Sequence, residues 1–553
     1  MKLKFSRKLR VLTFSLIATL AAIFCLYLYE TKDARQFEQL SQDLLYTELS
    51  GNTISLHYTL AYPENYGLSA DPILPSSFTD VDTRAQVTEW QRRLSCIDPQ
   101  KLDPQDRYAY LLFDRFLALT LEGADFTYYT DPLSPSSGMV SGLPVLLADY
   151  TFRTKKDVEN YLGILEQTGA YFDALIRYEQ EKSSAGLFMS DTSAYNVIEQ
   201  CDSIMDPVLL SDGSHFLQQT FTERLDGLAS DEIITGEEKQ QYIDKNNLLL
   251  TTVMAPAYER VGDAFLVLKG TGTNPYGLCY YPEGKEYYTY LLAQTTGSSR
   301  SIPEIRRLLE KDYQKNFHAL RDLIKNHPGL LKLSPEDFSL SLNMQNSYSD
   351  HPEEPGDTDL PTKPAATSDI LCRLSEAILD DLQKQMKPDF PKLTCIPEAK
   401  AGQEHDGESN SVSCQIKKVS SSMEAYSSPA YYLTPPIDDL WRNTIYLNEP
   451  NITDDLTLYT TLAHEGYPGH LYQTVYSQSF LNQQNASCIR SMLHYGGFVE
   501  GWAVYVENLS YGYAAQLTKN EEAAERYAQI ADHIGLGGTT TTEKVDALIA
   551  ELR

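Results

Sequence analysis

The chain has 553 residues, 42% of them apolar and 22% charged, and a formal net charge of −30 at pH 7. This composition is typical of an ordered globular protein and excludes a chain that is disordered throughout. The first 29 residues hold five basic residues and no acid, so the remainder carries −35. Because an acidic surface repels phosphate groups, we expect no nucleic-acid partner and no contact of this part with an anionic membrane surface.

The amino-terminal segment combines a basic flank with an apolar run. Residues 11–29 contain no charge, and about 20 apolar residues are enough to cross a bilayer as a helix. A cleaved secretion signal usually has a shorter run of about 7–15 residues that ends at small residues, and no such site lies between Cys25 and Glu30. We therefore predict that residues 1–30 are a single-pass membrane anchor with the acidic bulk outside the cytoplasm. The alternative is a cleaved signal and a secreted protein.

Most of the remaining chain is predicted to be helical. Apolar residues recur at spacings of three and four in long segments such as 105–123, 157–182 and 302–324. Residues 428–448 are the best candidate for extended structure, because they are rich in tyrosine and proline and are bounded by turn residues. We expect a small β element there, next to the segment discussed below.

Two stretches, 351–368 and 398–413, are rich in proline, glycine, serine and acid and are predicted to be exposed loops. Neither flank of these loops has a closed helical pattern of its own. We therefore expect them to interrupt one large domain over residues 31–515 rather than to separate two domains.

The segment 461–473 reads T-L-A-H-E-G-Y-P-G-H-L-Y-Q, a variant of the zinc signature H-E-x-x-H with a late second histidine. In a regular helix, residues six apart differ by roughly 120° around the axis, so His464 and His470 would not share an ion. Pro468 breaks that helix because its ring lacks an N–H and collides with the carbonyl of His464. The glycines on either side make a loop inexpensive. We expect this loop to return His470 to the position that i+4 holds in the regular signature.

Zinc-dependent hydrolysis requires three protein ligands, one open position for water and a carboxylate that accepts the proton of that water. Glu465 follows His464 directly, and we predict that it is the catalytic base. The third ligand must come from another segment. Residues 494–511 are predicted to be a helix in which Glu500 and Glu507 are seven apart and share one face.

The apolar neighbours of these two glutamates predict a buried setting, and they are Phe498, Val499, Trp502 and Val504. A buried carboxylate is costly unless it is paired or binds a metal. We therefore predict Glu500 as the third zinc ligand and Glu507 as the partner of a histidine ligand. A structural salt bridge from the two glutamates to Arg490 is the alternative.

Two further residues are candidates for the same site. His494 competes with Glu500 as a ligand, and it otherwise contacts substrate; as a fourth protein ligand it would make the zinc structural. Tyr446 is a candidate for the wall of the cleft, together with Tyr431 and Tyr432. Because the chain has 38 tyrosines, packing is the ordinary role of such residues.

The motifs H-E-G-Y-P-G-H at 464–470 and F-V-E-G-W-A-V-Y-V-E at 498–507, with the Tyr-rich stretch 427–448 before them, resemble a bacterial family catalogued as domain of unknown function 885. Segments 277–298 and 55–68 are also similar to it, so that the likeness covers residues 35–515. The family is similar to the mostly helical zinc carboxypeptidases of the thermophile type. The resemblance implies a mostly α, metallopeptidase-like domain with one Zn²⁺, with His464, His470 and Glu500 at ligand positions and Glu465 at the catalytic one.

Residues 516–553 depart from that pattern, and residues 526–552 instead resemble a piece near the carboxyl end of iron-dependent alcohol dehydrogenases. The piece lacks the histidine ligands and the nucleotide site of those enzymes, so we expect no dehydrogenase activity from it. A fusion or a truncation would leave part of the cleft wall missing.

These observations predict a membrane-anchored zinc metallopeptidase, of carboxypeptidase or oligopeptidase type, whose partner is a peptide substrate. The alternative is a truncated surface protein that binds peptide without cleaving it. The sequence does not specify the substrate, the direction of cleavage or the oligomeric state.

Overall fold

The computed structural model describes residues 31–69, 71–79, 82–274, 277–332, 367–393, 412–421, 423–424, 427–452, 454–493, 495–517 and 521–552. The predicted anchor lies outside these ranges. Among the residues that are described, no helix is both long and apolar enough to span a membrane. The greater part of the two predicted loops also lies outside them, and their last residues begin helix α17 and strand β1.

The described chain forms two compact units, and each is assembled from segments that are distant in sequence. The first unit comprises residues 31–51, 82–127 and 481–493. Its elements are α2 (Lys32–Leu49), α4 (Thr83–Leu94), η2 (Pro99–Lys101), α5 (Pro104–Gly123) and α20 (Ile489–Met492). Phe37, Phe113 and Ile489 are fully buried in its core. The late segment is therefore held by packing rather than by sequence neighbours.

The second unit contains the remaining elements and all the residues that form the candidate site. Its amino-terminal half is helical. The elements are α3 (Thr53–Thr59), η1 (Pro63–Tyr66), α6 (Met139–Ala148), α7 (Lys155–Ser184), α8 (Asp191–Ile204), α9 (Pro207–Asp212), α10 (Phe216–Ser230), α11 (Gly236–Leu249), the π-helical turn η3 (Leu250–Met254), α12 (Ala255–Leu268), η4 (Leu278–Tyr280), α13 (Gly284–Thr296), α14 (Ile302–Asn326) and η5 (Pro328–Lys332). The predicted helices at 105–123, 157–182 and 302–324 correspond to α5, α7 and α14. The mostly helical fold class is confirmed.

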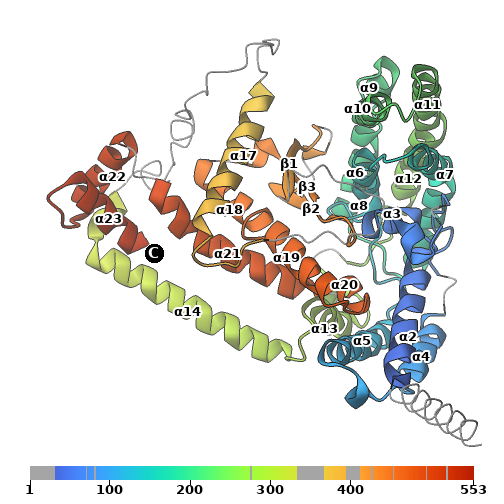
Figure 1. Ribbon diagram of the computed structural model, residues 1–553, viewed down its shortest axis with the longest axis horizontal. Helices are drawn as coiled ribbons and strands as arrows, with labels where there is room; N and C mark the ends of the chain where they lie inside the picture. Colours follow the sequence, from blue (N-terminus) through green and yellow to red (C-terminus); the bar gives the residue numbers. More distant parts are fainter. Residues whose placement is uncertain are drawn as a thin grey trace, which may run out of the picture. The chain divides into compact units, whose positions relative to one another are not determined.

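The carboxyl-terminal half of the second unit carries a sheet and the helices around it (Figure 1). Its elements are α17 (Thr367–Gln385), β1 (Ser413–Lys418), β2 (Ala430–Leu433), β3 (Arg442–Leu447), η7 (Glu449–Asn451), α18 (Asp455–Glu465), α19 (His470–Gln483), α21 (Gly496–Leu517), α22 (Glu521–Ile534) and α23 (Thr541–Leu552). Strand β3 is central, with β1 parallel on one side and β2 antiparallel on the other. The predicted extended stretch supplies β2 and β3, and β1 is an addition that the sequence interpretation missed.

The sheet separates two apolar cores, because successive side chains of a strand point to opposite faces. On β3, Ile445 and Leu447 pack with α17, α18 and α19, whereas Tyr446 packs with α6, α10 and their neighbours. Strand β2 lies at an edge of the sheet, so one side of its backbone is not paired with another strand of the described residues. That edge faces the candidate site.

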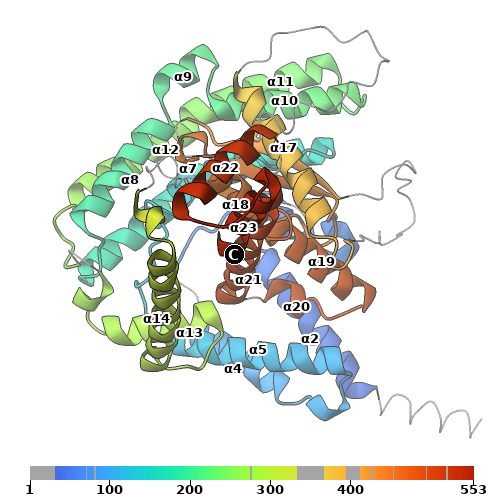
Figure 2. The ribbon, with the colours of Figure 1, turned by 90° about the vertical axis from the view of Figure 1, so that its left-hand side faces the viewer.

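The carboxyl-terminal tail packs as a small helical pair. Helices α22 and α23 lie against each other (Figures 1 and 2). Tyr527, Ala531 and Val545 are buried between them, and Leu330 of η5 joins this cluster. The predicted boundary at residue 515 falls inside α21, which continues to Leu517.

Candidate metal centre

The two histidines of the signature lie on two helices that meet at a tight turn. Helix α18 ends at Glu465 and α19 begins at His470, so the chain leaves the helix for residues 466–469. The interruption is a complete break between helices, as the chemistry of Pro468 requires. It allows the two imidazole rings to approach each other, with their centroids 4.8 Å apart and their planes nearly perpendicular at 86°.

Close packing at this turn explains both glycines. A Cβ atom on Gly469 would lie 1.8 Å from the carbonyl oxygen of His464, and one on Gly466 would lie 2.5 Å from Leu379 Cδ2. Any side chain at Gly469 would therefore push α19 away from the end of α18. The peptide bond between Tyr467 and Pro468 is cis. The Pro468 carbonyl accepts a hydrogen bond of 2.9 Å from Trp502 Nε1, which ties the turn to α21.

Glu500 of α21 completes a cluster of three donor atoms. Its Oε2 atom lies 3.5 Å from His464 Nε2 and 3.7 Å from His470 Nε2. The same carboxylate oxygen thus faces both imidazoles, and α18 packs directly against α21. Burial and the nearby His464 lower the pKa of His470. A neutral imidazole is the form that binds a metal.

Glu507, one heptad later on α21, holds the other side of the first imidazole. Its Oε2 atom lies 3.1 Å from His464 Nδ1. A carboxylate in this position orients the ring and directs Nε2 towards the cluster, which is the usual arrangement behind a metal-binding histidine. The sequence predicted that the two glutamates share one face of the helix, and in the structure both side chains lie against His464.

Glu465 lies beside the cluster but is held differently. Its Oε2 atom accepts a hydrogen bond of 2.9 Å from the backbone N–H of Tyr432 in β2. Burial raises the pKa of Glu465 to about 7, and Glu500 adds to this, while His464 and the Tyr432 amide oppose it. The side chain is thus a base whose pKa is near neutrality and whose second oxygen is not fixed by that bond.

These residues fit a zinc ion by their chemistry and spacing. Two imidazoles and a carboxylate are donors that zinc prefers, and tetrahedral bonds of about 2.0–2.1 Å separate neighbouring donors by about 3.3 Å. The observed separations of 3.5 and 3.7 Å need only a small contraction. His464, Glu465 and His470 also offer donor atoms within 4.8 Å of one another. Because the Tyr432 amide already occupies one oxygen of Glu465, Glu500 is the better third ligand.

The cluster opens into a cavity of about 470 Å³ that is lined by α18, α21 and residues 428–432. The side chains of His464 and His470 are 19% and 13% exposed, whereas that of Glu500 is 62% exposed. Solvent or a ligand therefore reaches the cluster from the α21 side.

Residues 74–532 of the chain match the family described as "Bacterial protein of unknown function (DUF885)". The chain belongs to this family. The match extends 17 residues past the limit of 515 that the motifs indicated, and it includes most of α22. No curated protein matches the DUF885 chain.

Two solved structures are similar to this DUF885 protein. One is titled "The crystal structure of the putative lipoprotein from Colwellia psychrerythraea"; it is 15% identical, with a TM-score of 0.63 over 95% of this chain and 89% of that one. The other is titled "The structure of a putative lipoprotein of unknown function from Shewanella oneidensis."; it is 17% identical, with a TM-score of 0.41 over 93% and 88% of the two chains. At such identities the first comparison supports the fold alone.

The prediction of a buried setting for Glu500 was wrong. Phe498 is 70% exposed and Val504 is 49% exposed. The buried positions of α21 include Ala503 and Val506, and further along the helix Ser510, Tyr513 and Ala514. The apolar residues around Glu500 thus form an open face beside the cavity, and amino-acid type alone did not distinguish the two faces of this helix.

The other predicted site residues lie elsewhere or are not described. Arg490 belongs to the first unit, where it donates to Gln105 Oε1 at 3.0 Å and lies over the ring of Tyr108. His494 lies outside the described residues. Tyr446 lines a different cavity and donates a hydrogen bond of 3.1 Å to Asp149.

Sequence reasoning missed the backbone of β2 as a part of the site. The Asn448 N–H of the segment after β3 donates to the Pro429 carbonyl at 2.9 Å. Because backbone groups alternate in direction along a strand, Pro429 and Tyr431 direct theirs towards β3. Ala430 and Tyr432 consequently direct theirs to the opposite edge of β2 and the cavity, where the Tyr432 N–H donates to Glu465. The signal that could have identified this strand is the short Ala-Tyr-Tyr-Leu run that follows a proline.

Proposed function

We propose that this DUF885 protein is a zinc-dependent peptidase whose ion is held by His464, His470 and Glu500. The observation that carries the proposal is the convergence of two Nε2 atoms and one carboxylate oxygen at 3.5 and 3.7 Å in an open cavity. Three protein ligands leave a coordination position free for water, which distinguishes a catalytic site from a structural one.

Glu465 is the proposed general base. When bound, zinc lowers the pKa of a coordinated water and polarises a substrate carbonyl. The Tyr432 amide holds Oε2 of Glu465 and leaves Oε1 to accept a proton from the attacking water. Glu507 keeps the His464 ring in the orientation that directs Nε2 into the cavity.

A peptide is the substrate that the free edge of β2 favours. An extended backbone bonds to an unpaired strand edge through its own N–H and carbonyl groups, independently of side-chain identity. Ala430 presents such groups along the cavity that contains the histidines, whereas the Tyr432 amide already donates to Glu465. A scissile bond in a strand paired there would lie beside the donor cluster.

We also propose an extracytoplasmic location. The apolar run at residues 11–29 with its basic flank supports an anchored protein. The structure of similar fold that is titled a "putative lipoprotein" from Colwellia psychrerythraea supports a membrane-associated or extracytoplasmic location.

A peptide-binding protein without catalytic activity is the second candidate. The exposed face of α21, with Phe498 at 70% and Tyr505 at 61% exposed, would serve binding as well as cleavage. In both candidate functions the peptide pairs with the edge of β2, but only the peptidase cleaves it.

The test is zinc analysis of the purified protein combined with a mixed-peptide cleavage assay read by mass spectrometry. We expect one equivalent of zinc and cleaved products, and loss of both in His470→Ala. Glu500→Gln should lose zinc, whereas Glu465→Gln should retain it, since only Glu500 is a proposed ligand. One equivalent of zinc with no cleavage would favour the binding protein, and retention of zinc in both His470→Ala and Glu500→Gln would contradict the site.

A further inference from the structure

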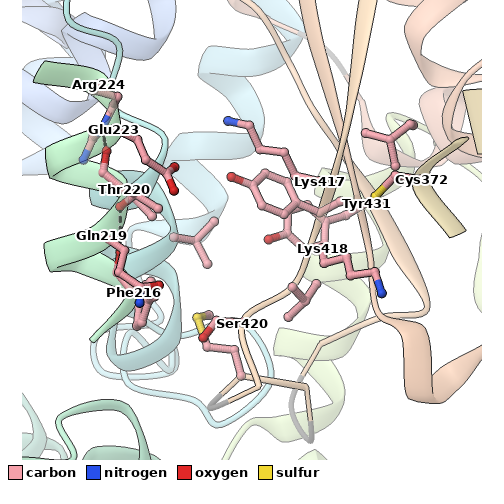
Figure 3. A pocket seen from close by; sticks show the side chains of 16 residues that line it. Phe216, Gln219, Thr220, Glu223, Arg224, Cys372, Lys417, Lys418, Ser420 and Tyr431 are labelled. Atoms are coloured by element: carbon pink, nitrogen blue, oxygen red, sulfur yellow. Dashed lines mark hydrogen bonds between the residues drawn. The ribbon is translucent and has the colours of Figure 1, made fainter. Parts of the chain in front are cut away.

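A second, larger cavity lies on the face of the sheet that carries Tyr446. It measures about 570 Å³ and is bounded by α10 on one side and by β1 and the tyrosines of β2 and β3 on the other. Figure 3 shows Glu223, Thr220 and Gln219 of α10 facing Tyr431 across this space. Its size lies within the usual range for sites of small ligands.

The walls of this cavity combine apolar surface with several charged side chains. The rings of Tyr431 and Tyr446 are stacked, with centroids 5.0 Å apart, and Val145 and Met423 add apolar surface. Lys417 pairs with Asp149, and Lys418 pairs with Glu449. Figure 3 shows the amino group of Lys418 directed away from α10.

The remaining charged groups of the wall are Arg224 and Glu223. Arg224 is held by backbone carbonyls rather than by a carboxylate: its Nη1 donates to Leu147 and Tyr150 at 3.0 and 2.6 Å, and its Nη2 is buried without a hydrogen-bond partner among the described residues. Within the described part of the chain, no ion pair or hydrogen bond involves the carboxylate of Glu223. The cavity therefore offers one carboxylate, that of Glu223, without a partner among the described residues.

Strand β2 connects this cavity to the metal centre. Tyr431 contributes to the lining of both cavities. Because side chains alternate along a strand, Tyr431 points to the face with Tyr446, while Tyr432 packs in the core beneath α18. A peptide paired with the free edge of β2 would direct every second side chain to the face of Tyr431, next to the larger cavity.

We propose that this cavity is the specificity pocket of the enzyme and that it accepts a lysine or arginine side chain of the substrate. The inference rests on the proposed peptidase function and adds its substrate class. The apolar stem of such a side chain packs against the stacked tyrosines, and its cationic end pairs with Glu223. Thr220 and Gln219 offer further hydrogen-bond acceptors on the same helix.

The test uses alanine hexapeptides in which arginine is scanned through each position, each paired with a peptide that carries citrulline there. Citrulline has nearly the shape of arginine and no charge, so the ratio of kcat/KM within a pair isolates the electrostatic contribution. Glu223 is on the solvent-accessible side of α10, so we expect a preference for arginine of about 2- to 5-fold. The preference should occur at one position or at positions two apart, as strand alternation requires.

Glu223→Gln should reduce the arginine-to-citrulline ratio to about 1, and Glu223→Lys should reduce it below 1. Glu199→Gln is the matched control, because Glu199 is an exposed glutamate of α8 outside the cavity. A ratio near 1 in the unmodified protein, or an unaltered ratio in Glu223→Gln, would overturn the pocket while leaving the peptidase proposal intact.

If none of the peptides is cleaved, the peptidase proposal fails and the pocket is judged by calorimetric binding of the same pairs to the unmodified zinc-loaded protein. Tighter binding of the arginine peptide that is lost in Glu223→Gln would support the pocket. Equal affinities within every pair would overturn it.

Discussion

Two glutamates of the second unit, Glu465 and Glu179, have the same raised pKa in very different surroundings. Burial is the main cause in both cases and raises the pKa of each side chain to about 7. Glu465 borders an open cavity beside two histidines. Glu179 lies in α7 with both carboxylate oxygens buried and without a hydrogen-bond partner.

The neighbours of the two carboxylates explain the difference in what each can do. Lys182 is one turn away from Glu179, is fully buried, and pairs with Asp131 and with the Thr130 carbonyl at 2.7 Å. It lowers the pKa of Glu179 in part, and Asp131 opposes that effect. Glu179 is not among the residues that line the cavity beside the histidines. A perturbed pKa therefore indicates a functional group only where access and reaction partners accompany it.

The contrast between Glu465 and Glu179 is tested most directly by replacing each carboxylate in turn with an amide. Glu465→Gln should reduce peptide hydrolysis by about 10²- to 10⁴-fold, because it removes the proposed proton acceptor. Glu179→Gln should leave the rate within about twofold, since no reacting group reaches it. The measurement is kcat at saturating zinc. Equal losses in the two variants would mean that burial, not position, sets the importance of these residues.

The second prediction concerns the pH dependence of stability. Glu179 has a pKa of about 7 in the folded state and an ordinary value of 4.5 when unfolded, so the folded state binds more protons between these values. Stability should therefore fall as pH rises from about 4.5 to 7, by at most about 3 kcal/mol, and Glu179→Gln should remove this fall. Urea unfolding of the metal-free protein at pH 5 and pH 8 measures it.

Zinc provides the control for this experiment. A bound cation lowers the pKa of a nearby carboxylate, so zinc should reduce the contribution of Glu465 to the same pH dependence. The contribution of Glu179, which lies outside the metal cavity, should persist. If Glu179→Gln does not change the pH dependence of stability, the folded protein must stabilise the charged form of Glu179 and keep its pKa near the unfolded value.

The smallest expected effect belongs to Glu507, a carboxylate that acts through His464. Glu507→Gln should weaken zinc binding by about 10- to 100-fold, because the imidazole loses its charged partner at 3.1 Å. Competition with a chelator measures the affinity, and Glu122→Gln, at an exposed glutamate of α5, is the control. Affinity unchanged in Glu507→Gln would assign that contact to packing alone.

The sequence predicted features that depend on local chemistry. Pro468 and its glycines required a break in the helix, and the seven-residue spacing of Glu500 and Glu507 placed both on one side of α21. The extended stretch before them was also recognisable from its composition. Each of these inferences depends only on residues that are close together in the sequence.

Features that depend on distant contacts were not predictable. The pairing of β1 with β3 joins segments whose relation no local pattern encodes. Arg490 appeared close to the glutamates in sequence, yet its partners are in α5. The exposed side of α21 was mistaken for its buried side because both sides carry apolar residues, and packing partners alone distinguish them.

The hydrogen bond from the Tyr432 amide to Glu465 has a consequence for the order of events in the cavity. One amide hydrogen serves one acceptor well, so a peptide whose carbonyl takes that hydrogen would release the carboxylate from it. Since this bond holds the pKa of Glu465 down, its release would make the carboxylate more basic. Under the proposed peptidase mechanism, substrate binding would therefore make Glu465 a stronger base, and water in an empty cavity would meet a weaker one.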